Sequence, residues 1–256
     1  MKNTTVIAVA VALLIGGIAG STYAGYGGKE KMKSIRDEQN TVRMSESYNM
    51  PDAADFVSVR PGVSALPSED LSTDEIDGLL FMREEEKLAR DVYTALYEKW
   101  SLPIFSNIAQ SEQTHTEAVK NVLDKYNLDD PVTDDSIGVF VNETLQNLYN
   151  DLTVQGMSSI EDALIVGATI EDLDISDLLV QLEKTDNQDI TLVYENLLRG
   201  SRNHLRAFIS QLQRYDGNYV PQYITQDVYD EILSSQQETG MMRGSGTSGW
   251  GWSNRR

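Results

Sequence analysis

Residues 82–93, with the sequence MREEEKLARDVY, predict a helix with an unusual buried face, because they place an acidic side chain in the middle of an apolar helical stripe. The stripe alternates steps of three and four residues and consists of Leu79, Met82, Glu86, Ala89, Tyr93, Leu96 and Trp100. This spacing is typical of the buried seam of a helix packed against other helices. A carboxylate in such a seam is costly unless it is paired or binds a metal.

A second stretch, SEQTH at residues 111–115, repeats the pattern. Glu112 and His115 lie one helical turn apart and therefore share a face. Their stripe is Phe105, Ile108, Glu112, His115, Val119 and Val122. Two helices with inward carboxylates, one of them carrying Glu-x-x-His, predict a metal site between helices.

Capping and breaking residues around these stretches predict a chain of helices. Ser72 and Glu75 match a capping box, Asn142 is a cap, and Ser158 and Glu161 match a second capping box. The predicted helices cover residues 73–99, 105–126, 143–154, 159–183 and 189–214, with a short one after 225 that ends near 235. The fold class is therefore all-α.

The third long helix also carries acids in its seam, at Glu171 and Asp174, although Gly167 and Thr169 raise the alternative of a broken helix. About thirty residues separate the second and third long helices, which lets them run parallel through a crossover. This predicts a ferritin-like four-helix bundle with a long crossover containing a short helix, plus a short C-terminal helix.

Four segments of the chain resemble one known family. They are residues 82–93, 107–115 (NIAQSEQTH), 166–175 (VGATIEDLDI) and 199–208 (RGSRNHLRAF). They are similar, in this order, to the ferritin-like family catalogued as domain of unknown function 2202. The resemblance covers about residues 71–233 and implies a ferritin- or rubrerythrin-like helical fold. It implies no reaction, because the family is named for the lack of one.

In the wider ferritin-like superfamily, the first and third helices each supply a glutamate, and the second and fourth each supply Glu-x-x-His. The resemblance therefore implies a metal set of Glu86, Glu112, His115, Glu171 and His204. The implied cofactor is iron, as a di-iron or mononuclear centre, or manganese. The fourth helix departs from the pattern, because Ser201 stands where glutamate is expected. Asp174, Glu85 or water would replace that ligand, or only one metal is held tightly.

Several of these residues have simpler interpretations. Glu84 and Glu85 are expected to be surface charges, and a shift in register would put one of them inward instead of Glu86. His204 fits metal ligation and equally a buried histidine bonded to a carboxylate. Tyr93 is expected to be a core aromatic rather than a redox tyrosine.

Composition narrows the function classes. The chain carries 21 Lys+Arg against 40 Asp+Glu, a net charge of −19, which argues against a nucleic-acid partner. It has no cysteine, so thiolate sites and disulfides are excluded, and any metal is held by oxygen and imidazole nitrogen. Such ligands suit iron, manganese or zinc better than copper(I).

The N-terminus reads as a targeting segment. Lys2, an apolar run at residues 6–19 and small residues up to Ala24 match a signal peptide over residues 1–24, with an uncleaved membrane anchor as the alternative. A polar linker (25–70), the helical domain (71–235) and a disordered Gly/Ser/Trp tail (236–256) follow. We expect a secreted or periplasmic protein that contacts a membrane only if this segment stays uncleaved, and the sequence leaves a homo-oligomer open.

These features favour an exported metal-binding protein with oxidoreductase character toward dioxygen or peroxide. The alternatives are a non-catalytic helical module with a metal-free polar core, and metal sequestration without turnover. A serine hydrolase is disfavoured because no Gly-x-Ser-x-Gly occurs, and there is no P-loop or dinucleotide fingerprint.

Overall fold

The computed structural model describes residue 63 and residues 65–239, all within one compact unit. The predicted all-α class is confirmed, since this part of the chain contains helices and no strand. The helices are α4 (Thr73–Trp100), α5 (Pro103–Lys125), α6 (Glu143–Gly156), α7 (Ile160–Lys184), α8 (Gln188–Gln213) and α9 (Gln226–Ser234). The predicted signal peptide (1–24), residues 25–62 of the linker and residues 240–256 of the tail lie outside the described residues.

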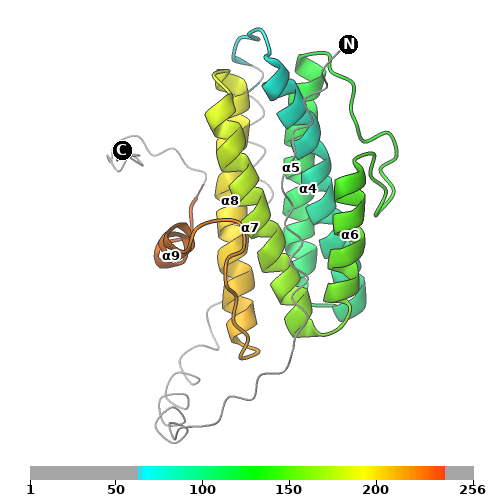
Figure 1. Cartoon of the computed structure of the whole chain (residues 1–256), viewed down its shortest axis with the longest axis vertical. Coiled ribbons are helices and arrows are strands. Elements are labelled where there is room, and N and C mark those ends of the chain that lie inside the picture. Colours follow the sequence, from blue (N-terminus) through cyan, green and yellow to red (C-terminus); the bar gives the residue numbers. More distant parts are fainter. Residues whose placement is uncertain (1–62, 64, 240–256) are drawn as a thin grey trace, which may run out of the picture. The chain divides into compact units, whose positions relative to one another are not determined.

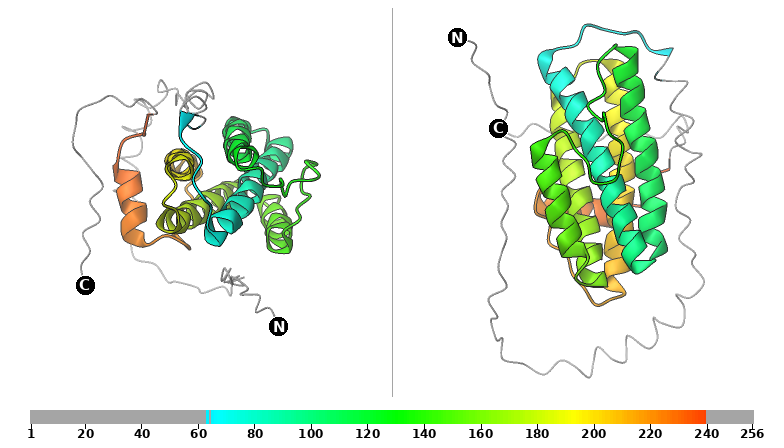
Figure 2. Two further views of the ribbon diagram at one scale, coloured as in Figure 1. Left: turned by 90° about the horizontal axis from the view of Figure 1, so that it is seen from above. Right: turned by 90° about the vertical axis from the view of Figure 1, so that its right-hand side faces the viewer.

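The four long helices pack side by side in two pairs (Figures 1 and 2). Helix α4 pairs with α5 and helix α7 with α8, while α4 also contacts α7 and α5 contacts α8. Figure 1 shows that α5 and α7 run in the same direction. The connection that contains α6 brings the chain back to the end at which α5 begins, and α7 starts from there. Helix α6 lies outside, against α4 and α7. No helix among the described residues is long and apolar enough to cross a membrane.

The helix boundaries follow from local chemistry. The predicted capping box at α4 is present, because the Ser72 hydroxyl accepts from the Glu75 N–H at 3.2 Å and the Glu75 carboxylate accepts from the Ser72 N–H at 2.8 Å. Helix α5 begins at Pro103, two residues earlier than predicted. Proline suits this position, because its fixed φ and missing N–H cost nothing in a first turn.

Helix α7 is continuous, so the predicted alternative of a break near Gly167 is wrong. Its cap is Ser159, which accepts from the Asp162 N–H at 3.0 Å, rather than the predicted Ser158. A Cβ on Gly167 would lie 2.4 Å from the Phe208 ring. The glycine therefore serves the close approach of α7 to α8 rather than ending the helix.

Charged side chains of α4 hold the connection between α5 and α6. The Glu84 carboxylate accepts from the N–H of Val141 at 2.6 Å. The Lys87 ammonium donates to the carbonyls of Ser136 at 2.9 Å and Val139 at 3.1 Å. Glu84 is only 4% exposed, so the prediction that it is a surface charge is wrong. The three-four spacing revealed only the face of α4 that meets other helices, whereas this connection covers the opposite face.

Lys87 also forms a fully buried ion pair with Asp91 at 2.6 Å, with neither side chain exposed. Asp91 in turn accepts from the N–H of Gly138 at 2.9 Å. The pair therefore links one turn of α4 to the backbone of the connection.

Replacing Lys87 with Met should destabilise the fold strongly, because Asp91 would keep, of its two ion pairs, only the one with Arg90 and the carbonyls of Ser136 and Val139 would lose a buried donor. We expect a loss of about 3–5 kcal/mol in the free energy of unfolding, measured by urea denaturation with circular dichroism. The matched control is Lys120→Met, which breaks a Lys–Asp pair of the same spacing whose side chains are 43% and 59% exposed. The control should cost less than about 1 kcal/mol. Equal losses in the two variants would contradict this account of Lys87.

Candidate metal centre

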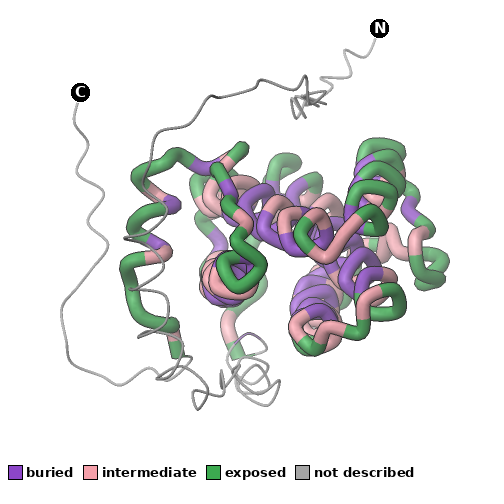
Figure 3. The backbone as a smooth tube through the Cα atoms, turned by 90° about the horizontal axis from the view of Figure 1, so that it is seen from below, coloured by how far each residue is buried: buried purple, intermediate pink, exposed green. Residues whose placement is uncertain are grey.

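All five predicted ligands meet at the middle of the four long helices. Helix α4 contributes one, α5 two, α7 one and α8 one: Glu86, Glu112, His115, Glu171 and His204. None is more than 2% exposed. Figure 3 shows the buried residues gathering on the facing sides of these helices. The ligands form two groups of three, Glu86 with Glu112 and His115 and Glu112 with Glu171 and His204, in each of which the candidate donor atoms lie within 4.8 Å of one another.

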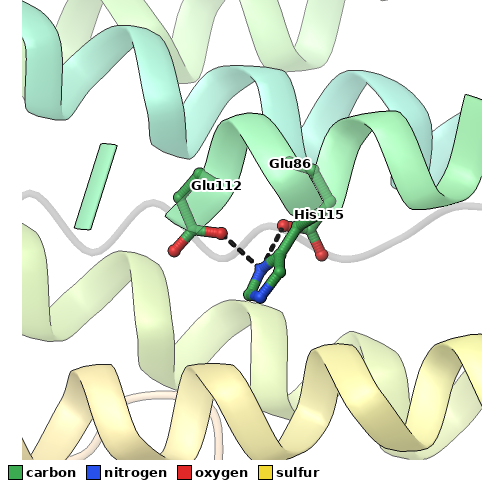
Figure 4. Close-up of side chains that lie close together, drawn as sticks. All are labelled: Glu86, Glu112 and His115. Carbon is green, nitrogen blue, oxygen red and sulfur yellow. Dashed lines mark hydrogen bonds and ion pairs between the residues drawn. The ribbon is translucent and has the colours of Figure 1, made fainter. Parts of the chain in front are cut away.

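The first group joins α4 to α5 (Figure 4). His115 Nδ1 lies 2.5 Å from Glu112 Oε2 and 3.2 Å from Glu86 Oε2. The short contact on α5 follows from the three-residue spacing, which stacks the two side chains on one face. The other oxygen of Glu86, Oε1, is buried without a hydrogen-bond partner.

The second group joins α5 to α7 and α8. His204 Nδ1 lies 2.8 Å from Glu112 Oε1 and 3.5 Å from Glu171 Oε2. This buried nitrogen forms ion pairs with both carboxylates but makes no hydrogen bond of standard geometry. The opposite nitrogen, Nε2, lies 3.1 Å from the Ser111 hydroxyl. Glu112 therefore belongs to both groups and presents one oxygen to each histidine.

Tyr93 and Ser201 lie around the two groups. Tyr93 is a core aromatic, as predicted, and packs 5.2 Å from the Phe208 ring. Its hydroxyl also donates to Glu171 Oε1 at 2.6 Å, which fixes that carboxylate. Ser201 contacts the carboxylate of Asp174. A carboxyl group from α7 thus lies against the α8 residue that replaces the expected glutamate.

The carboxyl groups differ in charge because their surroundings differ. Burial raises the pKa of Glu86 to about 8, although the nearby His115 lowers it. Burial also raises the pKa of Glu171. Burial would raise the pKa of Glu112 too, but His115 and His204 outweigh it and hold this pKa well below its usual value.

The two histidines respond to the same carboxylates. Burial lowers the pKa of His204, but Glu112 and Glu171 outweigh it and raise the value to about 9. Glu112 and Glu86 likewise raise the pKa of His115. Without a metal, an ionised Glu112 lies between two protonated imidazoles.

Glu85 was predicted as a surface charge and is instead 2% exposed. Neither of its carboxylate oxygens makes a hydrogen bond of standard geometry, although the Asp177 carboxyl group lies within hydrogen-bonding reach. Burial, together with the charge of Asp177, raises its pKa well above the usual value. No periodic signal could have revealed this residue, because it faces α7 from beside the seam that Glu86 occupies.

The donor set fits a transition metal. Carboxylate oxygens and imidazole nitrogens suit iron, manganese or zinc, and the residues come from four helices that fix their positions. The unsatisfied atoms Glu86 Oε1 and His204 Nδ1 belong to the two groups and would gain a partner from a bound cation.

The chain has close relatives. The sequence profile of an uncharacterized protein domain (DUF2202) matches residues 75–236. The uncharacterized protein MJ0754 of Methanocaldococcus jannaschii is 59% identical over 181 residues, which cover 71% of this chain and 98% of that protein. A crystal structure of the hypothetical protein MJ0754 from Methanococcus jannaschii aligns with a TM-score of 0.67 at 59% identity, over 68% of this chain and 99% of that chain. Neither name states an activity.

The metal-free protein should lose stability as the pH rises from about 4.5 to about 9. Folding raises the pKa of Glu86 from 4.5 to about 8 and that of His204 from 6.5 to about 9. In these pH ranges the folded chain binds more protons than the unfolded chain. Each group's contribution to the free energy of unfolding is therefore complete below its unfolded pKa and is lost once the pH reaches its folded pKa. Glu112, whose pKa is lowered, acts in the opposite sense only at more acidic pH.

The measurement is the melting temperature of chelator-treated protein by circular dichroism across this range. Glu86→Gln should flatten part of the decline that lies below pH 6.5, because it removes one of the buried carboxyl groups with a raised pKa that titrate there. A melting temperature that stays constant or rises with pH in the metal-free wild type would contradict the assigned protonation states.

Proposed function

The chain belongs to the family of the uncharacterized DUF2202 domain, and we propose that it is a ferritin-like protein that binds iron or manganese among its four long helices. The observation that carries the proposal is the pair of buried carboxylate–histidine groups that share Glu112. The proposed activity is that of an oxidoreductase acting with dioxygen or peroxide, outside the cytoplasm if the N-terminal segment directs export.

The arrangement of the helices supports a ferritin-like bundle. Helices α4 and α5 form one antiparallel pair, α7 and α8 form the other, and a long connection makes α5 and α7 parallel. Bundles with one such crossover build their metal sites from inward glutamates and Glu-x-x-His pairs on facing helices. Glu112 and His115 provide one such pair on α5.

Glu112 is the residue on which two metal positions would depend. One of its oxygens faces His115 and the other faces His204. Glu86 would complete the first position and Glu171 the second. This division favours two metal positions that would share Glu112 as a ligand over a single position.

When bound, iron or manganese would supply the electron transfer that reduces dioxygen or peroxide. The chain itself excludes bulk water, since no ligand is more than 2% exposed. Tyr93 orients Glu171 through its hydroxyl, and Ser111 holds the Nε2 side of the His204 ring. Glu86, protonated near neutral pH when no metal is present, would release its proton as a cation binds.

A second candidate function is a non-catalytic helical module with a metal-free polar core. The contacts of Glu112 with both histidines favour it, because these charges compensate one another without a metal. Ser201, in place of a fourth-helix glutamate, favours it as well. Metal binding without oxygen consumption would instead indicate sequestration.

Metal content tests the proposal and its division into two positions. The protein would be expressed with iron and manganese supplied and measured by inductively coupled plasma mass spectrometry. The wild type should hold about two ions per chain, Glu112→Gln should lose both, and Glu86→Gln or Glu171→Gln should each lose one, because only Glu112 belongs to both groups. The matched control is Glu98→Gln, an exposed acid on α4, which should keep the full content.

A wild type without metal, whose melting temperature is unchanged by added iron or manganese, would sink the metal proposal in favour of the non-catalytic module. For a loaded wild type, an oxygen electrode then separates turnover from sequestration.

A further inference from the structure

The burial of the ligands raises the question of how a cation reaches them. Near the centre, helix α7 carries acids at three-residue spacing, at Glu171, Asp174 and Asp177. This spacing places them about one helical turn apart on one side of the helix. Glu171 is 1% exposed and Asp174 6%, whereas Asp177 is half-buried. The carboxyl groups thus lead along α7 from the centre toward the surface.

Helix α4 adds a further carboxyl group beside this row. One contact indicates the antiparallel register of α4 and α7. A Cβ on Gly78 would lie 2.4 Å from Gln181 Oε1. Counting seven residues on from Gly78 and seven back from Gln181, this register brings Glu85 to about the level of Asp174.

These carboxyl groups have few partners beyond one another. Both oxygens of Glu85, Asp174 Oδ1 and Asp177 Oδ2 are buried and make no hydrogen bond of standard geometry, and the Glu85 and Asp177 carboxyl groups lie within hydrogen-bonding reach of each other. Burial raises the pKa of Glu85, and the charges of Asp177 and Asp174 raise it further, so the three groups lie within one another's field. Such an unfavourable arrangement adds no stability to the fold and therefore points to a ligand that is present only part of the time.

We propose that Asp177, Glu85 and Asp174 form the route along which a divalent cation passes from the surface to the metal centre. The inference rests on the proposed function and deepens it. Asp177 would take the cation from solvent, Glu85 and Asp174 would pass it inward, and Glu86 and Glu171 would receive it.

The ligand atoms along the route determine which cations it favours. The route offers only carboxylate oxygens, which favour hard divalent ions such as Fe²⁺ and Mn²⁺ over copper(I). Ser201 steadies Asp174 through its hydroxyl, at the place where the fourth-helix glutamate is missing. The substitution thus leaves Asp174 as a point of transfer next to the centre.

The outer end of the route borders a fixed segment. Asp172 accepts from the N–H groups of Gln222 at 2.6 Å, Tyr223 at 3.2 Å and Ile224 at 2.9 Å. Tyr223 lies near enough to Asp177 and Glu85 that their charges, after burial and Asp172, raise its pKa. The segment at residues 222–224, near Asp177, is therefore held by backbone N–H groups that donate to Asp172.

The test is the rate at which metal-free, full-length protein takes up Co²⁺, followed by stopped-flow absorbance of the bound ion. Glu85→Gln and Asp177→Asn should each slow uptake about tenfold, because an acidic approach raises the on-rate of a cation. The final stoichiometry should stay that of the wild type, since neither residue belongs to the ligand groups. The matched control is Asp151→Asn, an exposed acid on α6, which should bind at the wild-type rate.

Stability gives a second readout that is independent of metal. Glu85→Leu should raise the melting temperature of the metal-free protein, because it removes a buried carboxyl group that lies among other acids and makes no hydrogen bond of standard geometry. A merely structural Glu85 would lower it instead.

The outcomes separate the two proposals. A wild type that binds cobalt, with both route variants binding it equally fast, would overturn the route and leave the metal centre standing. Variants that lose stoichiometry rather than speed would also overturn the route, since they would be ligands. A wild type that takes up no cobalt, iron or manganese would overturn the proposed function, and the route with it.

Discussion

The carboxylate of Glu112 lies between two buried imidazoles, and the positions of the long helices depend on that contact. One oxygen meets His115 on the same helix, and the other meets His204 on α8. Opposite charges inside a protein compensate their desolvation only when they are held close together. The spacing of α5 and α8 is therefore constrained by chemistry as well as by packing, and Glu86 and Glu171 extend the constraint to α4 and α7.

Helix α4 makes structural contacts on two opposite faces. Its inner face carries Glu86 to the centre, while its outer face secures a connection without regular structure over most of residues 127–142. Arg83 binds Asp130 through two hydrogen bonds, and Arg90 reaches Asp135. The same run of charged residues that looks suited to solvent is therefore largely enclosed. The conformation of this connection is therefore fixed by side chains of α4 rather than by regular backbone hydrogen bonding.

Most of the fold could be predicted from local signals. Caps and three-four spacing located the helices, and an acid in an apolar stripe located Glu86 and Glu112 before any contact was known. Glu84 and Glu85 could not be placed in this way, because periodicity assumes one dry face and α4 is covered by α7 on one side and by the connection on another. Ser158 and Ser159 are each followed three residues later by an acid, so the sequence pattern allowed either cap.

The contact between Ser201 and Asp174 lay beyond sequence reasoning for another reason. It depends on how far α7 is shifted along α8, and that shift is set by the contact between Gly167 and the Phe208 ring. The identity of a residue does not reveal the axial register of its helix against a neighbour. The absence of a glutamate at position 201 could therefore be read from the sequence, whereas the contact of Ser201 with Asp174 could not.

The ligands are also spread widely along the chain, from Glu86 on the first long helix to His204 on the last. A nascent chain that has emerged only as far as α7 lacks one of the two imidazoles. The complete set of candidate ligands comes together only when α8 docks. If the chain binds a metal as we propose, the compartment in which folding finishes would therefore determine which ion it takes up.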